Sequence, residues 1–239
     1  ERFTRIKHWA GVPIKSIEYC LNDSNLKIDD IDYIVVGRDF NAKLFKKIKF
    51  AIKNYLSNAQ MIKHRFLSRK VNVNLEEKML KSFGSCPKIV YAEHHRCHLA
   101  SAFFSSPYNE SAVVSIDGSG DFSTIMIAKG SGSNIDVIES QDFPVSIGIL
   151  YAAFTQYLGF PYYGDEYKVM GLSPYGKPKY IKELRKIIWS GEKNILEWDS
   201  SFFNRDKPVH KYETNRPEVA ELFNVEKFES FFGKQRRTG

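Results

Sequence analysis

The chain has 239 residues, of which 43% are hydrophobic and 26% are charged, and its formal net charge is +7. This size and composition are typical of one large globular domain or two small ones. No apolar run approaches the roughly 20 residues that a membrane helix needs, so we expect no membrane partner. The three cysteines form no CxxC pattern, which predicts reduced thiols in a cytoplasmic protein. The positive charge favours anionic ligands such as nucleotides, phosphates or RNA.

Helical and β-strand patterns alternate in the first hundred residues. Apolar residues repeat at helical spacing in three segments, and β-branched runs that end in small residues predict strands. The expected elements are a helix that begins at Pro13, a strand over 31–37, helices over 42–66 and 75–84, a strand over 88–92 and a short helix that ends before Pro107.

The second half begins with a predicted β-meander. Its strands are expected over 112–118, 122–130 and 134–143, joined by the turns DGSGD and GSGSN, and they precede a helix over 147–160 with Ser146 as N-cap, a structured loop over 161–178 and a helix over 179–191. The pattern predicts an α/β or α+β domain without a clear internal boundary, and the loop over 161–178 is the best candidate for a hinge.

A basic segment extends from Phe40 to Leu75 without any acidic residue. It contains nine cationic side chains, which are Lys43, Lys46, Lys47, Lys49, Lys53, Lys63, Arg65, Arg69 and Lys70. The segment is either a face for anions or RNA or a solvated helix face. Because aromatic residues are not interleaved with the charges and no nucleic-acid motif occurs, we expect no nucleic-acid partner.

Three of the six histidines lie within AEHHRCHLASAF (92–103). On a helix, His94 and His98 share one face, where two neutral imidazoles can reach one transition-metal ion. The nearest third ligand is Asp117, at the end of the following strand. Two nitrogens and one carboxylate oxygen suit Fe(II) or Zn(II). The spacing alone is also compatible with ordinary packed or surface histidines.

Two glycine-containing segments could contact phosphate groups. In DGSGD, the backbone of Gly118, Ser119 and Gly120 can approach phosphate oxygens closely, or the segment is a plain hairpin turn. In GDEYKVMGLSPYG (164–176), Lys168 could neutralise a phosphate and Glu166 could accept a hydrogen bond from a ribose, or the segment is a salt-bridged surface loop.

Four stretches together resemble the O-carbamoyltransferases of the NodU/CmcH type. They are ERFTRIKHWAGVP (1–13), EHHRCHLASAFFSSPYNESAVVSIDGSGDFST (93–124), SIGILYAAFTQYLGF (146–160) and EYKVMGLSPYG (166–176). The resemblance spans nearly three quarters of the chain. The family commonly has SGEYK where this chain has GDEYK, so Asp165 replaces a glycine.

The resemblance implies a partial N-terminal domain over 1–239 with the actin/sugar-kinase/Hsp70-like (ASKHA, RNase H-like) fold, related to the tRNA threonylcarbamoyl-transferring protein TsaD. In the family, a separate YrdC-like domain makes carbamoyl-adenylate from carbamoyl phosphate and ATP. The carbamoyl group then passes to a substrate hydroxyl at a metal site. Some thirty preceding residues, a later metal-ligating Asp and the YrdC-like domain are expected outside this chain, so we expect the isolated chain to be inactive.

The residues that match the family motifs receive roles from the resemblance. His94, His98 and Asp117 match the metal ligands, Lys7 matches a lysine near the phosphate and carbamoyl groups, and Glu166 and Lys168 match the nucleotide-side loop. Asp199 is a candidate for the general base that takes the hydroxyl proton, and it is otherwise a surface turn residue. The alternatives are a tRNA threonylcarbamoyl transferase and a non-enzymatic nucleotide-binding actin-like module.

Overall fold

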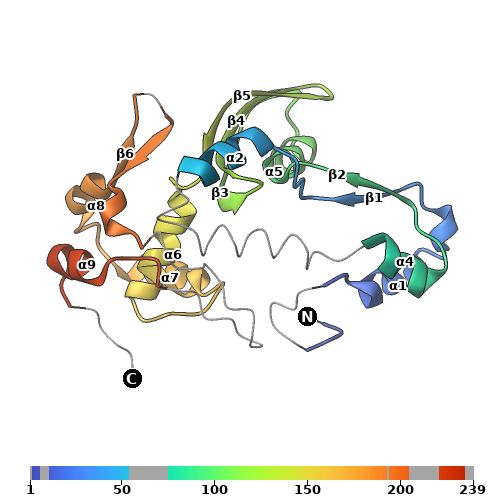
Figure 1. The fold of residues 1–239 in the computed structure, drawn as a ribbon, viewed down its shortest axis with the longest axis horizontal. Coiled ribbons are helices and arrows are strands. Elements are labelled where there is room, and N and C mark those ends of the chain that lie inside the picture. Colours follow the sequence, from blue (N-terminus) through green and yellow to red (C-terminus); the bar gives the residue numbers. More distant parts are fainter. Residues whose placement is uncertain (1, 6–10, 54–74, 193, 205–220, 235–239) are drawn as a thin grey trace.

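The computed structural model describes residues 2–5, 11–53, 75–192, 194–204 and 221–234 (Figure 1). This part of the chain is a mixed α/β protein with three regions. A parallel strand pair with its helices lies at one end, a three-stranded meander lies in the middle, and a helical region with aromatic residues lies at the other end. None of the helices in these ranges is long and apolar enough to cross a membrane.

The first region is built around two parallel strands. Its elements are α1 (Ile14–Asp23), η1 (Ile28–Asp30), β1 (Tyr33–Val36), α4 (Leu75–Phe83) and β2 (Lys88–Tyr91). The helix α2 (Leu44–Lys53) follows β1 in the chain but lies beside the meander (Figure 1). The strands pair from Tyr33 with Lys88 to Val36 with Tyr91. Parallel strands end at the same edge. The chain therefore leaves β1 and β2 at neighbouring points, where the N–H of Ala92 donates to the carbonyl of Val36 over 2.9 Å.

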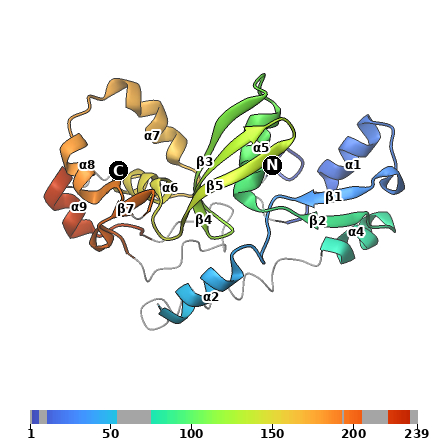
Figure 2. The same cartoon turned by 90° about the horizontal axis from the view of Figure 1, so that it is seen from above.

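The second region is a meander covered by one helix. It consists of α5 (His94–Phe104), β3 (Glu110–Gly120), β4 (Ser123–Ser131) and β5 (Asn134–Asp142), with strand order β3-β4-β5. The helix α5 lies against the sheet (Figure 2), and its residues Leu99 and Phe103 are buried with Val113, Met126 and Ala128. This packing fixes the helix over the sheet, and with it the side chains of the first helical turn.

The hairpin between β3 and β4 turns later than the sequence predicts. Gly120 pairs with Ser123, and Asp121 and Phe122 between them have φ angles of 50° and 82°. Two positive φ angles define a two-residue type I′ turn, which matches the twist of the flanking strands. The segment DGSG is therefore the irregular end of β3, with a register shift between Ile116 and Gly120. The expected DGSGD turn is wrong in this detail.

The third region contains the larger of the two apolar clusters of the described residues. Its elements are α6 (Ile147–Tyr157), α7 (Glu166–Leu172), η2 (Ser173–Tyr175), α8 (Ile181–Ile187), β6 (Ile188–Ser190), β7 (Leu196–Trp198), η3 (Ser200–Phe202) and α9 (Val225–Phe232). The ring of Phe228 is fully buried, with centroids 4.9 Å from Phe223 and 5.0 Å from Phe154. Aromatic contacts thus join α6 to α9.

Three expected elements have different bounds in the structure. The loop expected over 161–178 contains α7 and η2, and a hydrogen bond of 2.9 Å from the Tyr151 hydroxyl to the Glu166 carbonyl ties α7 to α6. The helix expected over 179–191 ends at Ile187, because Ile188–Ser190 pairs with β7. The helix expected over 42–66 is seen as α2, and residues 54–66 lie outside the described residues. The α1, α4, α5 and α6 helices confirm the sequence pattern.

Truncation of Phe228 tests the aromatic core. Removing a fully buried Phe side chain leaves a cavity, so Phe228→Ala should lower the free energy of unfolding by about 3–5 kcal/mol. The matched control is Phe104→Ala, because the Phe104 side chain is 56% exposed and should contribute little. Urea denaturation followed by circular dichroism measures both, and equal losses in the two variants would contradict the assignment of this core.

Candidate metal centre

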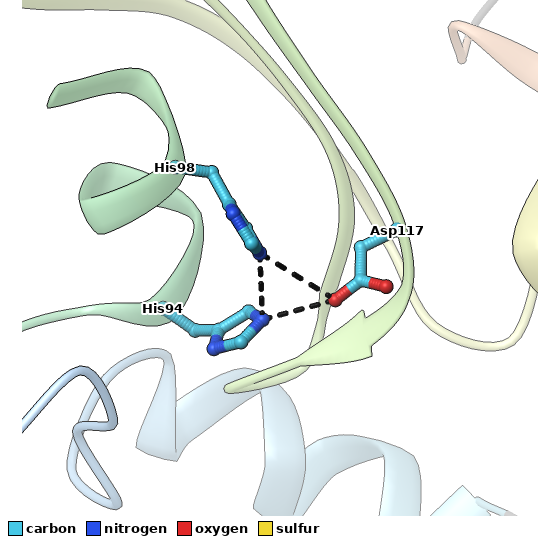
Figure 3. A group of neighbouring side chains, drawn as sticks. All are labelled: His94, His98 and Asp117. Atoms are coloured by element: carbon cyan, nitrogen blue, oxygen red, sulfur yellow. Dashed lines mark hydrogen bonds and ion pairs between the residues drawn. The ribbon is translucent and has the colours of Figure 1, made fainter. Parts of the chain in front are cut away.

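The two candidate histidines lie in the first turns of α5, one helical turn apart. The meander packs against α5, and both imidazoles point from the helix toward the end of β3 (Figure 3). The Asp117 side chain reaches toward them from β3 (Figure 3). The structure therefore brings together the three residues that the sequence placed in a metal site.

The orientation of His94 is fixed by a backbone carbonyl. Its Nδ1 lies 3.2 Å from the carbonyl oxygen of Gly37, in the segment that follows β1. A carbonyl oxygen can only accept, so Nδ1 carries a proton and donates. In the neutral ring, Nε2 then presents a lone pair toward Asp117 and His98. Metal-ligating histidines are commonly oriented by such a hydrogen bond on the opposite ring nitrogen.

Three ligand atoms converge at one point. Nε2 of His94 lies 2.9 Å from Oδ2 of Asp117 and 3.0 Å from Nε2 of His98, and the His98 nitrogen lies 3.8 Å from the same oxygen. Lone pairs this close repel one another unless a proton or a cation lies between them. The geometry fits either a protonated His94 paired with Asp117 or a cation held by two nitrogens and one oxygen.

The carboxylate of Asp117 stays charged at neutral pH. Burial alone would raise the pKa of Asp117, but the N–H of Gly118 and the rings of His94 and His98 outweigh it and hold this pKa below its usual value. The side chains of His94, His98 and Asp117 are 32%, 49% and 40% exposed. A cation bound there would keep open coordination positions toward solvent.

The backbone at Asp117 is held by the start of α6. The buried Ser146 hydroxyl lies 3.0 Å from the carbonyl of Asp117 and 2.8 Å from that of Gly118, and it accepts from the N–H of Ile149. The confirmed N-cap of α6 therefore also anchors the aspartate. Gly148 lies against the same segment, since a Cβ there would be 2.5 Å from the Gly118 nitrogen.

The middle histidine of the cluster has a structural role. His95 is fully buried, with Nδ1 2.8 Å from the Ser115 hydroxyl and Nε2 3.0 Å from the Ser123 carbonyl. Nε2 therefore donates to the carbonyl, and Nδ1 accepts from the hydroxyl. Burial lowers the pKa of His95, although the hydrogen bond to Ser123 acts in the opposite direction. A neutral His95 thus joins α5 to β3 and β4 from inside.

The glycines of DGSG have local roles that the sequence did not indicate. The N–H of Gly118 donates to Oδ1 of Asp117 over 2.6 Å, so it is already engaged. A Cβ on Gly120 would lie 1.9 Å from Cδ2 of His94, so only glycine leaves room for that imidazole. Contacts of Gly118, Ser119 and Gly120 with a phosphate remain a prediction.

The candidate nucleotide-side residues lie on α7. The ammonium of Lys168 pairs with the buried Asp165 carboxylate over 2.9 Å and lies 5.2 Å from the centre of the Phe160 ring. A phosphate at Lys168 would compete with this pair. Glu166 is the first residue of α7. Asp165 is thus the direct partner of the candidate phosphate-binding lysine.

Two further candidates are not part of the metal cluster. Asp199 is the N-cap of η3, and its Oδ1 accepts from the N–H of Ser201 over 2.9 Å and from the Ser201 hydroxyl over 2.5 Å. These contacts fit the alternative of a turn residue, and its catalytic role stays a prediction. Lys7 lies outside the described residues.

Part of the basic segment is engaged in ion pairs. Lys43 and Lys46 at the start of α2 both pair with Asp142 at the end of β5, and Lys47 donates to the carbonyl of Phe40 over 3.0 Å. Four of the nine cationic side chains, Lys63, Arg65, Arg69 and Lys70, lie outside the described residues. Among the described residues, the ion pairs hold the start of α2 against β5, an arrangement that neither of the two alternatives predicted.

Sequence reasoning missed the residues that orient the ligands. The carbonyl of Gly37 comes from a segment 57 residues before His94, and Ser146 follows Asp117 by 29 residues. Nothing in the spacing of either residue indicates the contact. A third such residue, Asp121, binds the N–H groups of Asp39 and His94.

The architecture and the candidate site indicate a general class of protein without any comparison of sequences. The chain is a mixed α/β protein in which one helix and the adjacent strand gather two imidazoles and a carboxylate, and among the described residues this is the group that could hold a metal ion. Residues 1–237 match the family described as carbamoyltransferase N-terminus, and the chain belongs to this family. The match confirms the resemblance inferred from the motifs.

Relatives of known sequence include nodulation proteins. The chain is 38% identical over 195 residues to an uncharacterized protein of Synechocystis sp., covering 76% of this chain and 31% of the relative. It is 32% identical over 193 residues to nodulation protein NolNO of Sinorhizobium fredii, and the match covers 77% of this chain and 26% of NolNO. It is 45% identical over 91 residues to nodulation protein NolO of Bradyrhizobium diazoefficiens, and the match covers 38% of this chain and 16% of NolO. The chain thus spans about a third or less of these proteins.

Substitution of Gly120 tests the close approach of His94. In Gly120→Ala the added methyl group overlaps the imidazole of His94, so the ring must move. We expect the free energy of unfolding to fall by about 1–3 kcal/mol. Gly118→Ala is the matched control, because a Cβ there has no atom within 4 Å. Thermal unfolding and the NMR shifts of the His94 ring are the measurements. Equal unfolding temperatures and equal His94 ring shifts in the two variants would contradict the close packing of His94 against Gly120.

Proposed function

We propose that this chain is the carbamoyl-transfer domain of an O-carbamoyltransferase with a divalent metal centre at His94, His98 and Asp117. The carbamoyl group would come from carbamoyl-adenylate, made from carbamoyl phosphate and ATP, and would pass to the hydroxyl of a small molecule. The convergence of the three ligand atoms carries the proposal, and membership of the carbamoyltransferase family supports it.

The ligand set fits a transition-metal ion. Two neutral imidazole nitrogens and one carboxylate suit Fe(II), and also Zn(II), because both accept mixed nitrogen and oxygen ligands and leave positions for a substrate. The Asp117 carboxylate supplies the negative charge, and the Gly37 carbonyl directs the Nε2 lone pair of His94 toward the same point. A bound divalent cation would supply Lewis-acid polarisation of the carbamoyl carbonyl.

The transfer itself is a displacement at the carbamoyl carbon. The acceptor oxygen forms a bond to this carbon, the bond from the carbon to the phosphate oxygen breaks, and AMP leaves. The hydroxyl proton passes to a general base, for which Asp199 is the candidate. The residues of the chain contribute a fixed geometry, since His94 is held by Gly37 and Asp117 by Ser146. Such preorganisation lowers the barrier because the dipoles need not reorient during the reaction.

The proposed fold is the actin/sugar-kinase/Hsp70-like one. The parallel pair β1-β2 followed by the antiparallel meander β3-β4-β5 supports it, because both are parts that such a domain contains. In this proposal the nucleotide contacts fall to Lys7, Glu166 and Lys168. Binding of phosphate by Lys168 then requires the ammonium to share or leave Asp165.

Metal content tests the centre directly. Anaerobically purified complete gene product should contain close to one Fe(II) or Zn(II) ion per chain, measured by elemental analysis. A His94→Ala/His98→Ala double variant should lose it, because two of the three ligands are gone. Asp117→Asn should weaken metal binding, whereas Asp136→Asn on the exposed side of β5 is the matched control. Equal metal in the wild type and the double variant would exclude this site.

The division of the reaction gives a second test. In the complete gene product, Asp117→Asn should leave ATP–pyrophosphate exchange with carbamoyl phosphate intact, since adenylation belongs to another domain in this proposal. Transfer to an alcohol, measured as carbamoylated product over a panel of sugars and aminoglycosides, should fall by at least about 100-fold. Loss of both activities together would contradict the assignment of Asp117 to the transfer step.

A further inference from the structure

We infer that Asp121 is the positioning residue of the metal centre. Its carboxylate holds the start of α5, and with it His94, against the segment whose carbonyl orients the His94 ring. The inference rests on the proposed metal centre, although part of its test is independent of any metal. Asp121 contributes no ligand atom to the cluster of His94, His98 and Asp117.

A single carboxylate oxygen joins two distant segments. Oδ2 of Asp121 accepts from the N–H of Asp39 over 2.7 Å and from the N–H of His94 over 2.9 Å. The donors are separated from Asp121 by 82 and 27 residues. The oxygen therefore connects the segment after β1, the start of α5 and the β3–β4 turn.

The contact with His94 replaces a local helix cap. His94 is the first residue of α5, and the side chain of the N-cap residue Glu93 makes no capping hydrogen bond. The first N–H groups of a helix have no partner within it, and an anion is stabilised there by the helix dipole. Asp121 supplies this partner and so fixes where the helix begins over the sheet.

The contact with Asp39 determines the orientation of the His94 ring. Asp39 lies two residues after Gly37, whose carbonyl accepts from Nδ1 of His94. If the bond from Asp39 to Asp121 is lost, the segment that carries this carbonyl keeps the Val36–Ala92 hydrogen bond on one side of Gly37 but loses its support on the other. Asp121 thus fixes both the backbone of His94 and the group that points its Nε2 toward Asp117.

The position of Asp121 within the turn suits this role. Its φ angle of 50° is tolerated by Asp and Asn better than by other residues with a side chain. Phe122 is buried at a φ angle of 82°, and its ring centroid lies 5.6 Å from that of Phe50 and 6.2 Å from that of Phe143. This packing keeps the turn in place, so that the Asp121 carboxylate faces the two donors.

A graded series at position 121 tests the role. Asp121→Asn keeps one acceptor oxygen without the charge, and Asp121→Gly keeps the turn without any acceptor. Neutral hydrogen bonds are about half as strong as charge-assisted ones, so Zn²⁺ should bind about 3- to 10-fold more weakly to the Asn variant. The Gly variant should lose about 10- to 100-fold, as is typical when a partner of a metal ligand is removed. Competition with a chromophoric chelator measures both on the complete gene product.

A second readout needs no metal. In the metal-free protein, hydrogen exchange of the His94 ring N–H and of the backbone N–H groups of His94 and Asp39 should be at least about tenfold faster in Asp121→Gly. Asp136→Asn, which removes an exposed carboxylate of the same sheet, is the control and should leave affinity and exchange unchanged. Wild-type exchange rates in Asp121→Gly would overturn the inference.

The outcomes separate this inference from the proposed function. If the wild type binds neither Zn²⁺ nor Fe²⁺, the metal centre fails, and the exchange rates still decide the role of Asp121. If the wild type binds Zn²⁺ and Asp121→Gly binds it equally well, the inference fails and the centre stands. If Asp121→Gly does not fold, Asp121→Asn decides, and wild-type affinity and exchange in that variant would overturn the role.

Discussion

The structure depends on the contact between the first turn of α5 and the end of β3. Gly120 has no side chain, and the His94 ring occupies the space that a Cβ would fill. The β3–β4 turn begins at the next residue, Asp121, and Asp117 lies three residues before Gly120. Helix and hairpin can approach this closely only because one position of the strand is glycine. The candidate ligands meet because of this approach.

The irregular end of β3 follows from the same constraint. A regular strand alternates its side chains between two faces, whereas the shift in register between Ile116 and Gly120 releases this segment from strict pairing with β4. Irregularities of this kind often re-aim side chains next to functional sites. Here the irregularity lets the Asp117 carboxylate face α5, while Ser146 holds its carbonyl from the opposite side.

The sequence predicted the elements that local patterns determine. Helical spacing found α1, α4, α5 and α6, and the four-residue spacing of His94 and His98 correctly implied a shared face toward Asp117. The sequence placed the hairpin turn at DGSGD because its glycines are typical turn residues. In the structure Asp121 and Phe122 form the turn, and the burial of Phe122 decides its position. Likewise, a Gly- and Tyr-rich segment hid α7, whose contact with Tyr151 is not visible in the sequence.

Long-range contacts with the backbone could not be predicted in the same way. Gly37, Asp39 and Ser146 act on the site through carbonyl, amide or hydroxyl groups, and only the tertiary fold brings these groups to the site. The lysines at the start of α2 show that the pattern of charges in a sequence has the same limit as a predictor of function. Their sequence suggests an anion-binding face, yet Lys43 and Lys46 are held by Asp142 of β5. A run of like charges therefore says little until the opposing carboxylates are located.

The openness of the cluster connects its geometry with the chemistry proposed for it. Three protein ligands complete neither a tetrahedral nor an octahedral shell, and the partly exposed side chains of His94, His98 and Asp117 leave the remaining positions accessible. A structural ion is usually enclosed by four protein ligands, whereas a catalytic ion keeps a position for substrate. In the proposed function, a further ligand and the carbamoyl-adenylate come from outside this chain, which spans about a third or less of its relatives. In the proposed centre, the contacts of Gly37, Ser146 and Asp121 would hold the three candidate ligands in place although the site is open on one side.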